Sequence, residues 1–183
     1  MRHIPNLLSL ARLALAPYVF ALQMQRRYTV VLWWFAILGI TDAVDGFIAR
    51  KFQATSRLGA YIDPLADKLL LSGMFVVLAY TGAIETWLAV IVLGRDVLIL
   101  AVAGILYLTG KRRNFPPSPW GKISTLVQIL LVMFSVGHLA GIVSLPPVTL
   151  LKWAAVALVA ISLLDYAYRL QRSDPPKPSI PNT

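Results

Sequence analysis

Residues 123–144 read ISTLVQILLVMFSVGHLAGIVS and contain no Asp, Glu, Lys or Arg. A helix needs about 20 mainly apolar residues to cross the hydrocarbon core of a bilayer, and this stretch is long enough. Five other stretches of the chain have a similar length and a similar apolar character. The sequence therefore predicts six membrane-spanning helices, at residues 6–24, 29–49, 60–80, 87–109, 123–144 and 148–170.

The composition agrees with a membrane protein. Of the 183 residues, 58 % are hydrophobic and 14 % are charged, whereas a soluble domain is about 45–50 % apolar and about 25 % charged. The apolar content excludes a disordered chain, and the lack of cysteine excludes a disulfide framework, a thiolate metal site and a cysteine nucleophile. We expect an all-α integral membrane protein, with one six-helix domain at residues 1–172 and a Pro-rich tail at 173–183.

The basic residues predict the orientation. The chain has 17 Lys and Arg against 8 Asp and Glu, which gives a net charge of +9. The cations gather at both ends of the chain and in the second–third and fourth–fifth connections, and among the connections only the first–second, with Arg26 and Arg27, breaks this pattern. Since Lys and Arg mark the cytoplasmic side, both termini should be cytoplasmic, as in a multi-pass protein of a bacterial cytoplasmic membrane. The hydropathy favours membrane lipids as partners and no nucleic acid.

Half of the acidic residues lie in one segment, TDAVDGFIARKFQATSRLGAYIDPLADK, at residues 41–68. On a helix Asp42 and Asp45 are about 60° apart, and they share their face with two small residues, Gly46 and Ala49. A second set has the spacing i, i+4, i+8, which also stacks its members on one face, and it consists of Gly59, Asp63 and Asp67. Two helices are thus expected to present paired carboxylates beside open space, at the cytoplasmic ends of the second and third spans.

Four carboxylates that converge at a site of low dielectric repel one another strongly. Two divalent cations, Mg²⁺ or Mn²⁺, would cancel the four charges, since such ions prefer oxygen ligands. Alternatively the acids are solvated at helix ends or pair with nearby cations, which are Arg50, Lys51, Arg57 and Lys68. Two metal ions are a common clamp for phosphoryl transfer, so the implied substrate is a membrane-embedded phosphate ester. A pathway for metal ions or protons would also use intramembrane acids, and that alternative stays open.

The pattern Asp42-x2-Asp45-Gly46-x2-Ala49-Arg50-x8-Gly59-x3-Asp63-x3-Asp67 resembles the signature of the CDP-alcohol phosphotransferases. The resemblance implies the six-helix fold of that family and a reaction in which an alcohol attacks the β-phosphorus of a CDP-linked lipid and releases CMP. It also implies a homodimer with an active site open to the cytosolic leaflet.

The resemblance assigns roles to the residues of this signature. Asp42, Asp45 and Asp63 would hold the divalent metal, and Asp67 would be the base that deprotonates the acceptor and can also touch the second metal ion. The CDP site would be lined by Gly46, Ala49 and Arg50, with Gly59 allowing close approach. The residues alone do not separate base from ligand, because a carboxylate near Mg²⁺ has a depressed pKa and is a weak base.

Basic residues elsewhere are candidates for binding the acceptor alcohol. They are Arg57 between the second and third spans, Arg95 in LGRDVL, and Lys122 in GKISTLVQ. Arg95 and Asp96 could cancel each other's charge inside the bundle, but they point about 100° apart on a helix, so we expect them to serve different partners. A basic pocket argues for an acceptor that carries phosphate and against serine, ethanolamine or choline.

Three segments, IPNLLSLAR, GRD and GKISTLVQ, resemble the phosphatidylglycerophosphate synthases and the CMP-forming cardiolipin synthases of the family. The substrates would then be CDP-diacylglycerol and either phosphatidylglycerol or glycerol 3-phosphate. Ser124 in GKIST and the Pro-rich insert before it favour the cardiolipin-forming branch by a small margin. Inositol phosphate is a further alternative.

Three other residues carry predictions about local structure. Pro64 should mark a kink or a helix start, because it lacks a backbone donor. Asp165 should pair with Arg169 four residues later. His138 should be a packing or interface residue.

Overall fold

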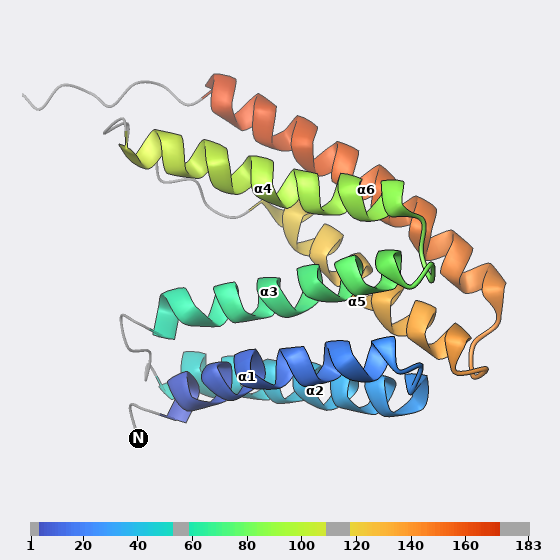
Figure 1. The fold of residues 1–183 in the computed structure, drawn as a ribbon. Coiled ribbons are helices and arrows are strands. Elements are labelled where there is room, and N and C mark those ends of the chain that lie inside the picture. The colour runs from blue at the N-terminus through green and yellow to red at the C-terminus, as the bar shows by residue number, and fades with distance from the viewer. Residues whose placement is uncertain (1–3, 53–58, 109–117, 173–183) are drawn as a thin grey trace, which may run out of the picture.

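The computed structural model describes residues 4–52, 59–108 and 118–172, and it gives the backbone alone for residues 4–12, 42–52, 59–67, 103, 106, 107 and 170–172. Over these residues the protein is all-helical (Figure 1). The helices are α1 (Ile4–Met24), α2 (Tyr28–Phe52), α3 (Gly59–Tyr80), α4 (Thr86–Leu108), α5 (Pro119–Leu139) and α6 (Leu145–Arg172).

Each of the six predicted stretches coincides with a helix, and the observed bounds differ most from the predicted ones for the fifth helix. We expected residues 123–144, but α5 begins at Pro119 and ends at Leu139. Proline is tolerated in the first turn, where its missing N–H would have no helical partner. Gly141, with a φ of 75°, ends the helix while the apolar sequence continues. The alternative of a helix start at Pro64 is wrong, since α3 already begins at Gly59.

The helices pack as an antiparallel bundle with α5 in a central place. α1 packs against α2 and α3, and α4 packs against α3 and α6. α5 contacts α2, α3 and α6 and so joins the two parts of the bundle (Figure 1). Over the part of the chain that the structure describes, α2 and α3 do not pack directly on each other. The core is apolar, and its largest fully buried side chains include Met74, Phe75, Leu78, Leu88 and Leu131.

Three turns at one end of the bundle have the same backbone design. Two residues beyond the ends of α1, α3 and α5 lies a residue with positive φ, namely Arg26 at 59°, Gly82 at 72° and Gly141 at 75°. In each turn the N–H of this residue bonds a carbonyl three residues back, and the next N–H bonds one five residues back. This is the Schellman arrangement, which satisfies the last carbonyls of the helix. The end of α2 and the start of α3 lie at the opposite end of the bundle (Figure 1).

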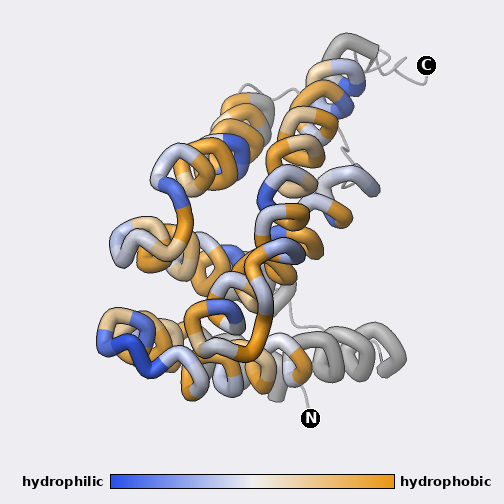
Figure 2. The backbone as a smooth tube through the Cα atoms, turned by 90° about the vertical axis from the view of Figure 1, so that its right-hand side faces the viewer, coloured by the Kyte–Doolittle hydropathy of each residue, from blue (hydrophilic) through white to orange (hydrophobic). Residues whose placement is uncertain are grey.

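Two helical segments are long and apolar enough to cross a membrane, Pro119–Leu139 and Leu145–Arg169, among the residues that the structure describes. Hydrophobic residues follow one another along most of the described helices, as the colouring of Figure 2 shows. Large apolar side chains that are more than half exposed include Trp33, Ile40, Val97, Leu150 and Leu164. These side chains lie on α2, α4 and α6, and exposed apolar groups on several helices fit a lipid surrounding.

Candidate active site

The acidic motif lies on two helices that meet the same end of the bundle. Asp42 and Asp45 belong to the last three turns of α2, and Asp63 and Asp67 belong to the first turns of α3. Both backbones are helical throughout these turns, so the spacing that places each pair on one face applies (Figure 1). The side chains of these four acids lie outside the described residues.

The other predicted residues of this segment have the same status. Gly46, Ala49 and Arg50 lie on the α2 backbone and Gly59 is the first residue of α3, but their side-chain surroundings are not described. Arg57 falls between the two helices, outside the described residues altogether. Among the described side chains, no three His, Asp or Glu groups come together as a metal site. The predicted metal ligands, the four motif acids, lie outside that set, and their carboxylate oxygens are of the kind that suits Mg²⁺ or Mn²⁺.

A buried polar cluster begins one residue after this motif. The Arg95 Nη1 donates to Asp96 Oδ1 at 2.7 Å, and its Nη2 donates to Ser162 Oγ at 2.6 Å. Lys68, which follows Asp67 in the chain, places its Nζ 3.2 Å from the same Asp96 oxygen. These four residues, Lys68, Arg95, Asp96 and Ser162, form what we call the Arg95 cluster. It joins α3, α4 and α6.

The charges of the Arg95 cluster do not balance among the described groups. Two cations, Lys68 and Arg95, share the single carboxylate of Asp96. Arg95 is only 7 % exposed, and its Nε is a buried donor without a hydrogen-bond partner among the described atoms. An excess positive charge in a region of low dielectric attracts an anion. The cluster therefore favours an anionic group close by.

The expectation that Arg95 and Asp96 serve different partners is wrong in one respect, because the two side chains bind each other. The flexible arginine chain is long enough to turn its guanidinium back onto the neighbouring carboxylate, which the angle between the two Cβ directions does not reveal. Each also has a partner of its own, Ser162 for Arg95 and Lys68 for Asp96.

The start of α5 lies against the Arg95 cluster. A Cβ placed on Gly121 would stand 3.1 Å from Arg95 Nη2 and 3.9 Å from Ser162 Oγ, so the absent side chain makes room for the guanidinium. Lys122, the next residue, is exposed on the first turn of α5. The structure thus brings two of the three predicted acceptor-binding residues, Arg95 and Lys122, to neighbouring segments.

A second polar contact holds the same end of α5 to α6. Asp165 accepts hydrogen bonds from Ser118 and from Arg169, the latter at 2.9 Å. The predicted pair between Asp165 and Arg169 is therefore confirmed. His138 lies at the other end of α5, where its Nδ1 is 2.9 Å from the Val143 carbonyl, and it takes part in the α5–α6 turn.

Sequence reasoning missed Ser162 and the close approach of Gly121. Ser162 is a lone polar residue in the apolar stretch of α6, and that isolation is a signal that it has a buried partner. Which partner it has depends on how α6 packs, and the sequence alone does not contain that information.

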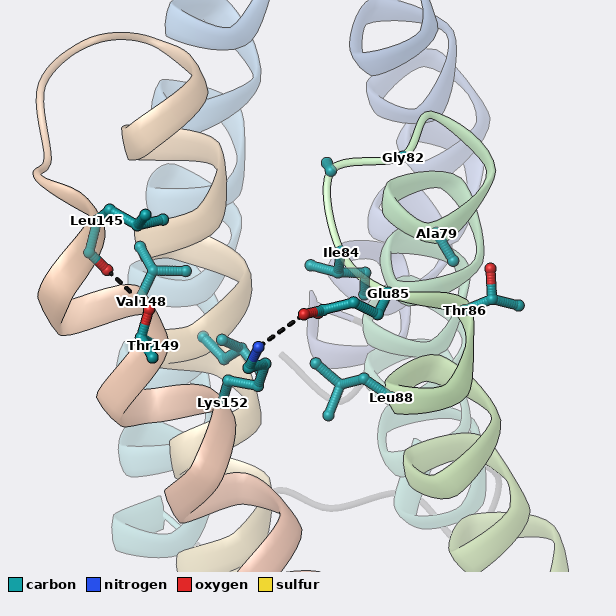
Figure 3. A pocket seen from close by; sticks show the side chains of 12 residues that line it. Ala79, Gly82, Ile84, Glu85, Thr86, Leu88, Leu145, Val148, Thr149 and Lys152 are labelled. Atoms are coloured by element: carbon teal, nitrogen blue, oxygen red, sulfur yellow. Dashed lines mark hydrogen bonds and ion pairs between the residues drawn. The ribbon is translucent and has the colours of Figure 1, made fainter.

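A pocket of about 500 Å³ lies at the opposite end of the bundle, near the α3–α4 turn and the start of α6 (Figure 3). Glu85 and Lys152 point toward each other across it and form an ion pair of 2.6 Å. The hydrogen bond from the Lys152 ammonium holds the pKa of the Glu85 carboxyl below its ordinary value. The pocket contains none of the predicted site residues, so the chemistry proposed for the motif does not involve it.

Comparison with known proteins gives relatives over most of the chain. The chain is 35 % identical over 150 residues to the cardiolipin synthase (CMP-forming) of Rattus norvegicus, which covers 72 % of this chain and 49 % of that protein. It is 34 % identical over 178 residues to the probable phosphatidylglycerophosphate synthase of Mycobacterium tuberculosis, and the match covers 93 % of this chain and 82 % of that protein. It is 31 % identical over 175 residues to the CDP-diacylglycerol–glycerol-3-phosphate 3-phosphatidyltransferase of Aquifex aeolicus, and this match covers 91 % of this chain and 95 % of that protein.

The chain spans about half the length of the cardiolipin synthases that it matches. A model of the CDP-alcohol phosphatidyltransferase family matches residues 2–164. This match covers the helices that carry the motif and the Arg95 cluster. The chain therefore belongs to the CDP-alcohol phosphatidyltransferase family, whose members are membrane-bound.

Proposed function

We propose that this protein transfers a phosphatidyl group from CDP-diacylglycerol to a phosphate-bearing, glycerol-type acceptor and releases CMP. The observation that carries the proposal is the placement of the Arg95 cluster beside the acidic motif. Consecutive Cα atoms are about 3.8 Å apart, so Lys68 fixes the cluster next to the backbone of Asp67. Acids for a metal and excess positive charge for an anionic substrate thus occur in one region.

The reaction assigns a task to each group. The acceptor hydroxyl oxygen forms a bond to the β-phosphorus of CDP-diacylglycerol, the bond from that phosphorus to the bridging oxygen breaks, and CMP leaves. Asp67 takes the hydroxyl proton, and its value as a base rests mainly on its position. Divalent ions held by Asp42, Asp45, Asp63 and Asp67 would neutralise charge on the phosphate oxygens. Gly46, Ala49, Arg50 and Gly59 would line the CDP site.

The acceptor is proposed from charge and from the relatives. Arg95, Lys122 and Arg57 would bind its phosphate, and the buried, partly unpaired guanidinium of Arg95 supports this role. Relatives named as cardiolipin synthase and as phosphatidylglycerophosphate synthase have similar identity to the chain. We favour phosphatidylglycerol narrowly over glycerol 3-phosphate, with inositol phosphate as the alternative. The fully buried Ser124 accepts a hydrogen bond from Gln128 at 3.2 Å, so its part in this choice would act through helix packing.

The membrane arrangement is also part of the proposal. All six helices would cross the bilayer, with both termini and the active site on the cytoplasmic side, and the functional unit would be a homodimer. The arrangement of Figure 1 supports this topology, because the ends expected in the cytoplasm lie together at one end of the bundle.

The test is CMP release by the purified protein in detergent, with CDP-diacylglycerol, Mg²⁺ and a panel of the three acceptors. We expect one acceptor to support release and Asp67→Asn to lower the rate by at least about 10²-fold, the scale of a lost general base. Glu85→Gln is the matched control, since it also removes a carboxylate but lies at the opposite end of the bundle, where Glu85 pairs with Lys152, and it should keep the wild-type rate. No CMP with any of these acceptors would refute the proposal and favour the ion-pathway alternative.

A further inference from the structure

Among the described residues, Lys68 and Asp96 form the ion pair that links α3 to α4. The side chain of Asp96 is 10 % exposed and that of Lys68 is 35 % exposed, so the pair is partly shielded from solvent. Asp96 is also held by Arg95, which is bonded to Ser162 on α6. The Lys68 ammonium therefore binds a carboxylate whose own position is fixed by two other helices.

The Lys68–Asp96 ion pair lies far from the α3–α4 turn, so it can limit how far α3 tilts about that turn. The two helices are joined at the α3–α4 turn, and Lys68 lies twelve residues before Tyr80 at the end of α3. At 1.5 Å per residue the pair is about 18 Å from the turn, and Asp67 is about 20 Å from it. A tilt of α3 by about 3° around the turn would move the Asp67 backbone by about 1 Å, a misplacement on the scale that costs about 10²-fold in rate.

We propose that the Lys68–Asp96 ion pair is a positioning device for the reaction, and that Lys68 and Asp96 are positioning residues that hold the first turns of α3 at a fixed tilt against α4. This proposal rests on the proposed function, because the group it positions is Asp67. Lys68 and Asp67 are adjacent and point about 100° apart on the helix. One residue can therefore hold the helix to α4 while the other serves the reaction.

The test compares Lys68→Met with Lys152→Met. Lys152 forms an ion pair of the same type, at 2.6 Å, between α6 and the start of α4, but at the end of the bundle away from the motif. Each substitution removes one ammonium group from one ion pair and leaves an unbranched side chain that is one atom shorter. We expect Lys68→Met to lower kcat by about 10- to 100-fold with less than a threefold change in KM for CDP-diacylglycerol, and Lys152→Met to keep the wild-type kcat.

Two further measurements separate positioning from general stability. Thermal unfolding of the two variants should give similar shifts in Tm, and Lys68→Arg should restore most of the lost kcat, since it keeps the charge and the reach. Should Lys68→Met not survive purification, Asp96→Glu replaces it, because both charges remain and only the length of the pair changes. Because Asp96 is buried, the added methylene group should also lower Tm, so kcat is measured well below the Tm of the variant, where a value at least threefold below wild type is expected.

The proposal is overturned if Lys68→Met loses no more activity than Lys152→Met, or if Asp96→Glu in its place keeps the wild-type kcat. The proposal is also overturned if Lys68→Met raises only a KM, for CDP-diacylglycerol or for the acceptor, and leaves kcat unchanged. That result would make Lys68 a substrate ligand. Wild-type CMP release is the separate check on the proposed function. Its absence refutes that function, whereas an active wild type with an unaffected Lys68→Met refutes the positioning proposal alone.

Discussion

Gly73 on α3 lies directly against the ring of Phe20 on α1, and replacing it by alanine tests the packing of these two helices. A Cβ on Gly73 would stand 2.2 Å from Cζ of Phe20 and 2.7 Å from its Cε2. An ordinary contact begins near 3.4 Å, so the ring or the helix would have to retreat by about 1.2 Å. Overpacking of this kind costs about 1–3 kcal/mol.

The substitution also has a favourable term. Alanine stabilises a helix interior by about 1 kcal/mol relative to glycine, so Gly73→Ala should be destabilised by up to about 2 kcal/mol relative to the wild type. For a protein of this size 1 kcal/mol corresponds to about 2–4 °C in Tm. We therefore expect Tm to fall by up to about 8 °C in detergent, measured at one scan rate because membrane proteins often unfold irreversibly.

Gly104 on α4 is the matched control, because a Cβ there would meet nothing within 4 Å. Gly104→Ala should leave Tm unchanged or raise it through helix propensity alone. Phe20→Leu removes the end of the ring, so it should cost less in the Gly73→Ala background than in the wild type, with a coupling of at least about 0.5 kcal/mol. A Gly73→Ala protein as stable as Gly104→Ala would refute the described packing of α1 on α3.

Three other substitutions test separate features. Arg26→Gly should raise Tm by a few degrees, since a non-glycine residue with positive φ costs about 1–2 kcal/mol and glycine's own entropy offsets only part of that; an unchanged or lower Tm would contradict this. Because the pKa of Glu85 is lowered by Lys152, the stabilisation from this pair is present above its unfolded pKa and is lost as the pH falls through the lowered value, below about pH 4.3. Tm should therefore decrease on acidification less in Lys152→Met than in the wild type, and equal slopes would show that the pair contributes nothing. The chain has no cysteine, so Ile142→Cys, exposed in the α5–α6 turn, should react with an impermeant maleimide from outside the cell, and Asn114→Cys only after permeabilisation; the reverse pattern would invert the proposed topology.

The helices were predictable from the sequence to the extent that hydropathy defines them. The ends of α1 and α3 at Met24 and Tyr80 agree with the predicted stretches because charge or a turn residue follows directly. The end of α5 was not predictable from hydropathy, since apolar residues continue past Leu139 into the turn. The local chemistry of Pro119 and Gly141 decides that helix, and a hydropathy average does not detect it.

Part of the candidate site was predictable from the sequence and part was not. The motif could be identified because its acids and small residues recur at helical spacing along two segments, and spacing is a property of the sequence. The Arg95 cluster could not be predicted, because its members lie on α3, α4 and α6 and their pairing depends on how the helices pack. Side-chain length matters as well, since Arg95 reaches a neighbour that points away from it.

The arrangement of α2 and α3 has a consequence for how this enzyme family can vary. These helices carry the two halves of the motif, yet over the described residues each packs on α1 and α5 and not on the other. The distance between the described parts of α2 and α3 is then set by the side chains of α1 and α5 that pack between them. Substitutions on α1 and α5, although they lie outside the motif, are expected to change the distance between the two helices that carry the acid pairs. Variation among relatives in the proposed metal site should therefore be sought among the apolar residues of α1 and α5 as well as in the motif.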